Sequence, residues 1–193
     1  AVVVPRPVQQ PHPPIRMATT SVETFPAAGR MGLPIFVGLR TTELDDLQQQ
    51  LAPYREAWRE SGHPGTGSVY LRIPVYVSPT AAGAREEPRQ SMSAFFARQT
   101  ELARAAVGRA GAGPADKRRT EAAGMGNLTY EDVLARKVVS GTAPAVVDRL
   151  KQLAAELGLD GIIAEPNPGG LIPAELETRS LRLLTHDVIP ALA

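Results

Sequence analysis

Residues 33–58, LPIFVGLRTTELDDLQQQLAPYREAW, place a short apolar run directly before an amphipathic helix. The apolar run, residues 33–39, has the length of a strand that is buried in a parallel sheet. Thr41 and Thr42 are predicted to start the helix, and Ser61-Gly62 to end it. Its apolar residues recur at spacings of three and four and form one stripe: Leu44, Leu47, Leu51, Tyr54 and Trp58. The stretch therefore predicts one strand–helix unit of an α/β protein.

The same alternation of strand and helix recurs on both sides of this unit. Further strands are predicted at residues 15–18, 69–77 and 161–164, because these runs are short and apolar. Strand followed by helix four times over predicts a parallel sheet with crossover helices. A complete (β/α)8 barrel needs roughly 250 residues. The chain is therefore predicted to be either a small open α/β sheet or half of a barrel, and composition does not separate the two.

The remaining helices are predicted from their apolar stripes and their end signals. They are a helix that Gly32 ends, a long helix at 82–107, a short one at 130–139, a helix that Thr142 caps and Gly158 ends, and a last helix near the C-terminus. The helix that Gly32 ends is predicted to bury Phe25, Ala28 and Met31, and the long helix to bury Met92, Phe95, Phe96, Gln99 and Leu102. The helix that Thr142 caps is predicted to bury Val147, Leu150, Leu153 (or Ala154) and Leu157, and the last helix Leu181, Leu184 and Val188.

The composition excludes several classes of function. The chain has 193 residues, of which 43% are apolar and 21% charged, as in an ordinary globular domain. A net charge of +1 supplies no basic footprint for nucleic acid or for an anionic membrane surface. No run approaches ~18 consecutive apolar residues, which excludes a transmembrane helix. The absence of cysteine excludes disulfides, thiolate catalysis and Cys-based metal sites.

Three other features carry no specific chemistry. His12, His63 and His186 show no metal-ligand spacing, so no metal site is predicted. Residues 65–67, Gly-Thr-Gly, lack the Lys-Ser/Thr of a phosphate-binding P-loop and precede a strand, so they are interpreted as a turn. The chain begins with Ala1 rather than Met, and its first residues do not have the pattern of a signal peptide.

The residues after the first predicted strand carry a family resemblance. Residues 18–25, ATTSVETF, and 27–34, AAGRMGLP, resemble the fifth strand and helix of the bacterial luciferase-like flavin-dependent monooxygenases. Further similarity lies in PRPVQ at 5–9, PHPPI at 11–15, YED at 130–132, VSGT at 139–142, LDGI at 159–162, GGLIP at 169–173, SLRL at 180–183 and DVIP at 187–190. The resemblance implies strands five to eight of a (β/α)8 TIM barrel, so that residues 1–193 form one domain, the C-terminal half of the barrel.

The resemblance also implies an activity. It is a monooxygenase reaction in which reduced flavin mononucleotide (FMN), supplied by a separate reductase, and O2 oxidise a small-molecule substrate. An alternative on the same barrel is an oxidoreductase that uses the deazaflavin coenzyme F420. An alternative of another class is a non-catalytic partner or truncated flavin-binding subunit. We expect the proton-transfer residues to lie in an absent N-terminal half, the isolated chain to be inactive, and the full-length protein to be a cytoplasmic homo-oligomer.

The resemblance places the cofactor-binding positions at Thr20, Ser21, Val22 and Thr24. Ser21 and Thr24 fall on the two phosphate-binding hydroxyl positions of the family, whereas luciferase itself has a glutamate where Thr20 stands. A phosphate at this place would meet unpaired N–H groups and the positive end of a helix. The same two residues also fit an ordinary N-cap, with Ser21 as the cap and Thr24 at the third helical position.

Weaker candidates lie after the last strand and in a long loop. Glu165 and Asn167 follow the strand at the C-terminal mouth where barrel sites gather, so they could face the substrate or the flavin ring, or fix a loop. Residues 108–126 are predicted to be a mobile loop. Luciferases carry a lid at this place, in which the basic run 117–119 (Lys-Arg-Arg) would contact the ligand; a solvated linker is the alternative.

Overall fold

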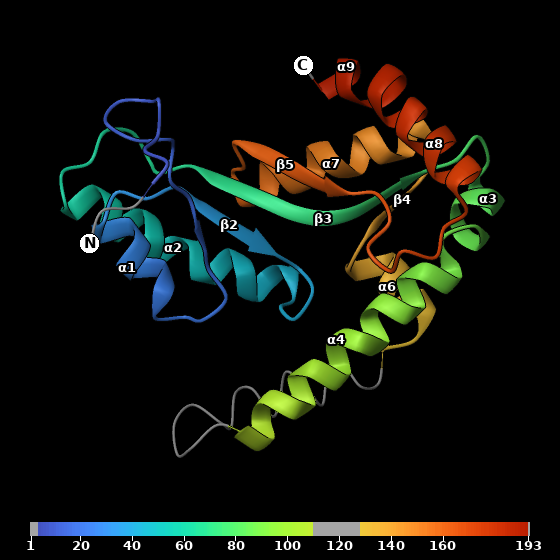
Figure 1. Cartoon of the computed structure of the whole chain (residues 1–193), viewed down its shortest axis with the longest axis horizontal. Helices are drawn as coiled ribbons and strands as arrows, with labels where there is room; N and C mark the ends of the chain where they lie inside the picture. Colours follow the sequence, from blue (N-terminus) through green and yellow to red (C-terminus); the bar gives the residue numbers. More distant parts are fainter. Residues whose placement is uncertain (1–3, 110–127, 193) are drawn as a thin grey trace.

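A parallel sheet of five strands organises the computed structural model, which describes residues 4–109 and 128–192. The strands are β1 (Met17–Ala18), β2 (Ile35–Gly38), β3 (Val69–Val77), β4 (Val139–Gly141) and β5 (Gly161–Glu165). Their order is β1-β2-β3-β4, and β5 also pairs with β3. Figure 1 shows β3 between β2 and β5. The series β1-β2-β3-β5 is the arrangement expected of four consecutive barrel strands.

The helices follow the strands along the chain (Figure 1). They are α1 (Thr24–Arg30), α2 (Leu44–Glu60), α3 (Ala81–Glu86), α4 (Arg89–Arg109), α6 (Tyr130–Arg136), α7 (Ala143–Leu157), α8 (Ala174–Leu183), a π-helical turn η1 (Leu184–Val188) and α9 (Ile189–Leu192). The predicted ends of α7 are confirmed, with Thr142 at its N-cap and Gly158 at its C-cap in the left-handed conformation at φ 59°. A residue with a Cβ is strained at that φ, which explains the glycine.

One face of the sheet forms the main core. Alternate residues of β3 from Val69 to Val77 point to this face and are buried. The apolar stripes of α2 and α7 pack against them, as their spacing predicts, and Leu47, Leu153 and Leu157 are at most 2% exposed. The outer face of the sheet is therefore covered by helices that the sequence pattern identifies correctly.

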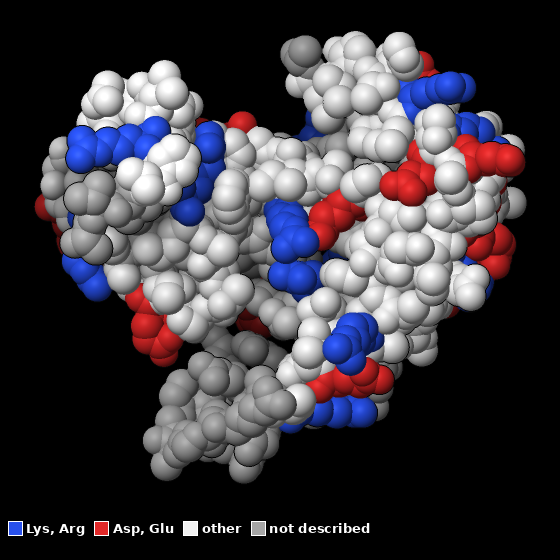
Figure 2. All heavy atoms as spheres, viewed as in Figure 1, with Lys and Arg blue, Asp and Glu red and all other residues white. Residues whose placement is uncertain are grey.

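The opposite, inner face of the sheet is only partly covered in the described part of the chain. Phe36 and Tyr70 are half-buried there and meet edge to face, with their ring centroids 5.9 Å apart. Arg72 is exposed on the same face, two residues along β3. Near the C-terminal end of β3 a second apolar cluster buries Tyr76 against Phe96 of α4 and other residues. Figures 1 and 2 look onto this inner face, with α2 and α7 behind the strands.

Two helix predictions were wrong in detail. The helix expected at 82–107 is two helices, α3 and α4, separated near Pro88, whose ring lacks the N–H that a continuous helix needs. Thr41 and Thr42 precede α2 rather than start it; the N-cap is Glu43, and the carbonyl of Thr42 accepts a 3.0 Å hydrogen bond from the buried ammonium of Lys137.

Two strand boundaries also differ from expectation, and three residues predicted to be buried are exposed: Met31 at 61%, Leu102 at 48% and Leu181 at 37%. Val139 is not helical but begins β4, where it pairs with Val75 of β3, so the helical piece ends at Arg136. The first strand is limited to Met17–Ala18, because only these residues pair with β2. In the last helix Val188 is fully buried but Leu181 is 37% exposed, contrary to the predicted stripe. A π-helical turn at η1 shifts the face that the helix buries.

A substitution at Gly29 tests the close contact of α1 with α2. An added Cβ would collide with the backbone carbonyl of Tyr54 and lie 3.0 Å from the backbone nitrogen of Trp58. Helix propensity alone would make Gly29→Ala stabilising by about 1 kcal/mol. Because the obstacle is backbone that cannot swing aside, we expect instead a loss of about 2 kcal/mol in the free energy of unfolding. Urea unfolding measures it, and an unchanged or increased stability would contradict the packing.

Candidate functional site

All of the predicted site residues lie at one edge of the sheet. Because the strands are parallel, their C-terminal ends share this edge, where ligands of α/β sheets bind. Residues 20–24 follow β1, Glu165 is the last residue of β5, and Asn167 comes two residues later. The structure therefore brings both groups to the same edge, with β2 and β3 between them.

The loop from β1 to α1 sets the two predicted phosphate hydroxyls side by side. The hydroxyl and the backbone N–H of Thr24 both donate to the carbonyl of Ser21, at 2.6 Å and 3.0 Å. The Ser21 hydroxyl donates to Oγ1 of Thr24 at 3.5 Å. The N-cap of α1 is Glu23, and it makes no side-chain cap hydrogen bond. The alternative in which Ser21 caps the helix is therefore wrong, since Ser21 Oγ does not receive the backbone N–H of Thr24.

The same loop is fixed to the sheet at its start and open at its tip. The backbone N–H of Thr19 donates to the carbonyl of Phe36 at 3.0 Å, which ties the loop to β2. Ser21 and Thr24 are half-buried, and Thr20 is exposed. Val22 is 41% exposed, so it contributes little to the core. The cofactor contacts of these residues stay predictions.

Glu165 forms an ion pair that the sequence did not predict. Its Oε1 accepts a hydrogen bond from Nη2 of Arg72, although the two residues are 93 positions apart in the chain. The Glu165 side chain is 14% exposed and that of Arg72 46%. The second oxygen, Oε2, is buried and has no hydrogen-bond partner among the described residues. One feature of the sequence could have indicated this ion pair: Arg72 is the one charged residue in the apolar run 69–77.

Asn167 fastens the loop after β5. Its Oδ1 accepts from the Ser91 hydroxyl at 2.8 Å and from the backbone N–H of Ile172 at 3.2 Å. Its Nδ2 donates to Glu177 at 2.9 Å and to the carbonyl of Ile172 at 3.3 Å. These bonds use both lone pairs and both hydrogens of the amide. The visible role of Asn167 is therefore to join the loop to α4 and α8, and its contact with substrate stays a prediction.

A partly buried polar network lies at the C-terminal end of β3. The Tyr76 hydroxyl donates to Oε2 of Glu87 at 2.8 Å, and Nη2 of Arg179 donates to Oε1 at 2.6 Å. Burial, and then the hydrogen bond to Glu87, raise the pKa of Tyr76 to about 12. Burial alone would raise the pKa of Glu87, but the hydrogen bonds from Arg179 and Tyr76 outweigh it, so the pKa is lowered. The network joins β3, the α3–α4 junction and α8.

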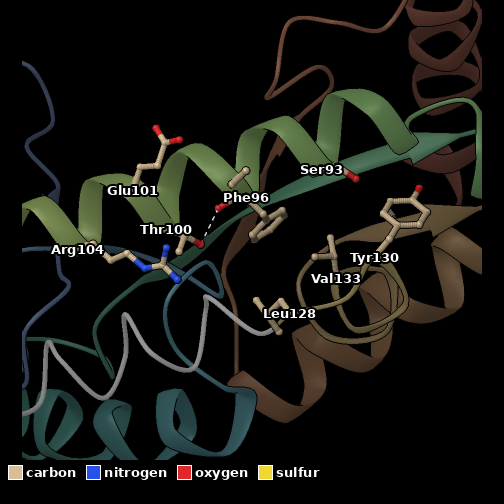
Figure 3. A pocket seen from close by; sticks show the side chains of 9 residues that line it. Ser93, Phe96, Thr100, Glu101, Arg104, Leu128, Tyr130 and Val133 are labelled. Atoms are coloured by element: carbon tan, nitrogen blue, oxygen red, sulfur yellow. Dashed lines mark hydrogen bonds between the residues drawn. The ribbon is translucent and has the colours of Figure 1, made fainter.

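A hollow of about 320 Å³ lies between α4 and α6 rather than at the strand ends. Figure 3 shows Phe96 of α4 facing Val133 and Tyr130 of α6 across it. At the far end Arg104 reaches toward the hollow, and Thr100 donates its hydroxyl to the carbonyl of Phe96 at 3.0 Å. The hollow is therefore a separate feature from the loop after β1.

The remaining sequence predictions meet the limits of the described chain. α4 extends through Arg109, so the first two residues of the loop predicted at 108–126 are helical, and the rest of that loop lies outside the described residues. The same holds for the predicted contacts of the basic run 117–119. Within residues 4–109 and 128–192, no three His, Asp or Glu side chains are grouped to hold a metal ion. No helix in those ranges is both long and apolar enough to cross a membrane.

Solved structures share this fold over half their length. The monooxygenase RslO1 from Streptomyces bottropensis has a TM-score of 0.71 at 22% identity, over 98% of this chain and 51% of that one. The FMN complex of the oxygenating constituent of 3,6-diketocamphane monooxygenase, from the CAM plasmid of Pseudomonas putida, has a TM-score of 0.71 at 19% identity, over 94% and 50%. The coenzyme F420 dependent tetrahydromethanopterin reductase from Methanopyrus kandleri has a TM-score of 0.62 at 16% identity, over 93% and 51%. A search of curated proteins found no match.

These likenesses confirm the predicted fold class, half of a (β/α)8 barrel with its parallel strands and outer helices. Barrels of this kind serve flavin- and F420-dependent oxidoreductases. The chain belongs to the luciferase-like monooxygenase family, whose model matches residues 1–161. It spans about half the length of the family structures that it matches.

The pH dependence of stability tests the network around Glu87. Because its folded pKa is lowered, the carboxylate contributes stability above the ordinary Glu pKa of about 4.3, and this contribution is lost as the pH falls through the lowered value. We expect Glu87→Gln to cost about 1 to 3 kcal/mol at pH 7 and progressively less below pH ~4. Unfolding at several pH values measures this, with the exposed Glu60→Gln as control. A cost that does not change with pH would contradict the assignment.

Proposed function

We propose that the chain supplies the cofactor-binding half of a flavin-dependent monooxygenase, which uses reduced FMN and O2 to oxidise a small organic molecule. The observation that carries this proposal is the adjacent pair of hydroxyls, Ser21 and Thr24, at the C-terminal edge of a half-barrel of this family. When bound, FMN supplies the reaction with O2, whereas the protein binds and orients the flavin and excludes water. A separate reductase would supply the reduced flavin.

The two hydroxyls suit a phosphate because both can turn toward it. The Ser21 hydroxyl makes only a long contact, 3.5 Å, to Thr24, so it can donate elsewhere at little cost. The Thr24 hydroxyl donates to the carbonyl of Ser21 at 2.6 Å, and it would exchange this hydrogen bond for one to a phosphate oxygen. Hydroxyl donors bind phosphate oxygens without adding charge. The carboxylate of Glu23, between them in sequence, would repel a phosphate, so it must point away in the complex.

Coenzyme F420 is the second candidate. It is favoured by the likeness to F420-dependent enzymes, including a secondary alcohol dehydrogenase with a TM-score of 0.58 over 93% of this chain. Both cofactors present a phosphate and a three-ring system with the same pyrimidine edge. A non-catalytic partner subunit is the third candidate, because the chain spans about half the length of the enzymes that it resembles.

Removing both hydroxyls tests the phosphate site. We expect Ser21→Ala with Thr24→Ala to weaken FMN binding about tenfold or more, because hydrogen bonds to a charged group are lost, and to leave riboflavin binding unchanged. Quenching of flavin fluorescence on titration with protein measures both affinities. A matched control is Thr66→Ala with Ser68→Ala, a Thr/Ser pair that precedes β3 at the opposite edge of the sheet. Equal FMN affinity in the double variant and wild type would refute the assignment.

Turnover of the isolated chain tests the proposed division of labour. We expect the purified chain with reduced FMN to consume O2 no faster than free FMN does, because the proton-transfer residues are expected in the other half of the barrel. An oxygen electrode with candidate aldehyde or ketone substrates measures the rate. Substrate-dependent oxygen consumption by the chain alone would contradict this expectation.

A further inference from the structure

We propose that Arg72 and Glu165 together form the subsite that binds the pyrimidine edge of the cofactor ring. The inference rests on the proposed flavin function and adds to it a ring-binding pair that the family match does not assign. Arg72 positions the carboxylate of Glu165, and the second carboxylate oxygen accepts a hydrogen bond from the ring N–H. The pair lies on the inner face of the sheet, toward the edge where the phosphate loop begins.

The strand register brings the two side chains onto one face. Arg72 is the Cα partner of Gly38 on β2 and of Ile163 on β5. Glu165 lies two residues beyond Ile163, and side chains at that spacing point to the same face of a strand. The partner of Arg72 on β2 is a glycine, so no side chain occupies the inner face at that point. Figure 2 shows basic and acidic side chains meeting near the centre of this face.

The carboxylate has one oxygen in use and one without a partner. Oε1 accepts from Nη2 of Arg72, whereas Oε2 is buried without any hydrogen-bond partner in the described residues. A buried charged acceptor without a donor is unfavourable and uncommon, so it calls for a partner that completes it. Arg72 is 46% exposed and carries further N–H groups beyond the one that Glu165 receives. Exposed donors of Arg72 therefore lie beside a buried acceptor, which a rotation of the Glu165 carboxyl group would bring into contact with the ring.

This pair complements an imide. The pyrimidine edge of a flavin, and equally of a deazaflavin, presents an N3–H between two carbonyl oxygens. The Glu165 oxygen can accept from N3–H while a guanidinium N–H donates to the neighbouring carbonyl. Neither side chain alone supplies both functions. The proposed contact thus selects a ring with an N–H flanked by carbonyls and is indifferent to whether the ring carries nitrogen or carbon at position 5.

The separation of the pair from the phosphate loop agrees with one cofactor bridging both. Along the series β1-β2-β3-β5, three strand spacings separate the loop after β1 from Glu165, or about 14 Å along the sheet. An extended flavin mononucleotide spans a comparable length from its phosphate to its ring. The inner face between the two ends bears Phe36 and Gly38 on β2.

The test measures binding of FMN, riboflavin and N3-methylriboflavin to the chain by fluorescence titration. In Glu165→Gln the amide oxygen will face Arg72, which only donates, so an NH2 group replaces the acceptor Oε2. We expect this variant to bind both FMN and riboflavin about 10-fold or more weakly, whereas N3-methylriboflavin, which lacks the donor, binds wild type and variant alike. Arg72→Met is expected to weaken all three ligands, because N3-methylriboflavin keeps the carbonyl that the guanidinium contacts, and Arg72→Lys to cause a smaller loss.

Arg16 provides the matched control. Its guanidinium stacks over Tyr70 at 4.7 Å on the same inner face but forms no ion pair with a carboxylate in the described residues. Arg16→Met is therefore expected to leave riboflavin affinity unchanged. Thermal unfolding without flavin is measured for every variant, so that a loss of stability is distinguished from a loss of binding. Both cofactors have the imide edge, so the affinity for coenzyme F420 is compared with that for FMN to show which of the two the chain prefers.

The outcomes separate this inference from the proposed function. If Glu165→Gln lowers the affinities for riboflavin and N3-methylriboflavin equally, or lowers neither, the ring contact is refuted while the phosphate site stands. If the wild-type chain binds FMN through Ser21 and Thr24 but does not bind riboflavin, the ring contact is also refuted. If it binds none of the flavins or coenzyme F420, the proposed function fails and the inference fails with it.

Discussion

The constraint on which this structure depends is that a parallel sheet must be covered on both faces. Helices α2 and α7 bury one face of β3, and the stripes that do so are the strongest signal in the sequence. The other face carries the half-buried Tyr70 and the exposed Arg72 in the described part of the chain. In a closed barrel that face lines the interior. The partly uncovered face agrees with the match of this chain to about half the length of the family structures.

Parallel strands also decide where the chemistry gathers. They bring the hydroxyls after β1 and the carboxylate that ends β5 to one edge, although more than 140 residues separate Ser21 from Glu165. The polar groups that stabilise this edge differ from those proposed to bind the cofactor. The side chains of Asn167 and Glu87 are hydrogen-bonded to other protein groups, whereas one carboxylate oxygen of Glu165 has no hydrogen-bond partner among the described residues. The groups that are hydrogen-bonded within the protein hold the loops in place, and the Glu165 oxygen without a protein partner is the one proposed to bind the ring.

The sequence predicted those parts of the fold that local patterns determine. The stripes of α2 and α7, the bounds of β3 and the glycine that ends α7 are all local, and all are confirmed. β4 was missed because three residues form a strand only through pairing with β3. Pro88 indicates a break between two helices, but the apolar spacing around it favours one continuous helix, and the prediction followed the spacing. The ion pair of Arg72 with Glu165 depends on strand register across 93 residues, which no spacing rule supplies.

The most direct test of this account is a crystal structure of the chain with FMN bound. The account predicts the phosphate within hydrogen-bond distance of the Ser21 and Thr24 hydroxyls, with the ring across the inner face and its pyrimidine edge on Arg72 and Glu165. A phosphate bound away from the loop after β1, or a ring inserted between α4 and α6, would contradict it.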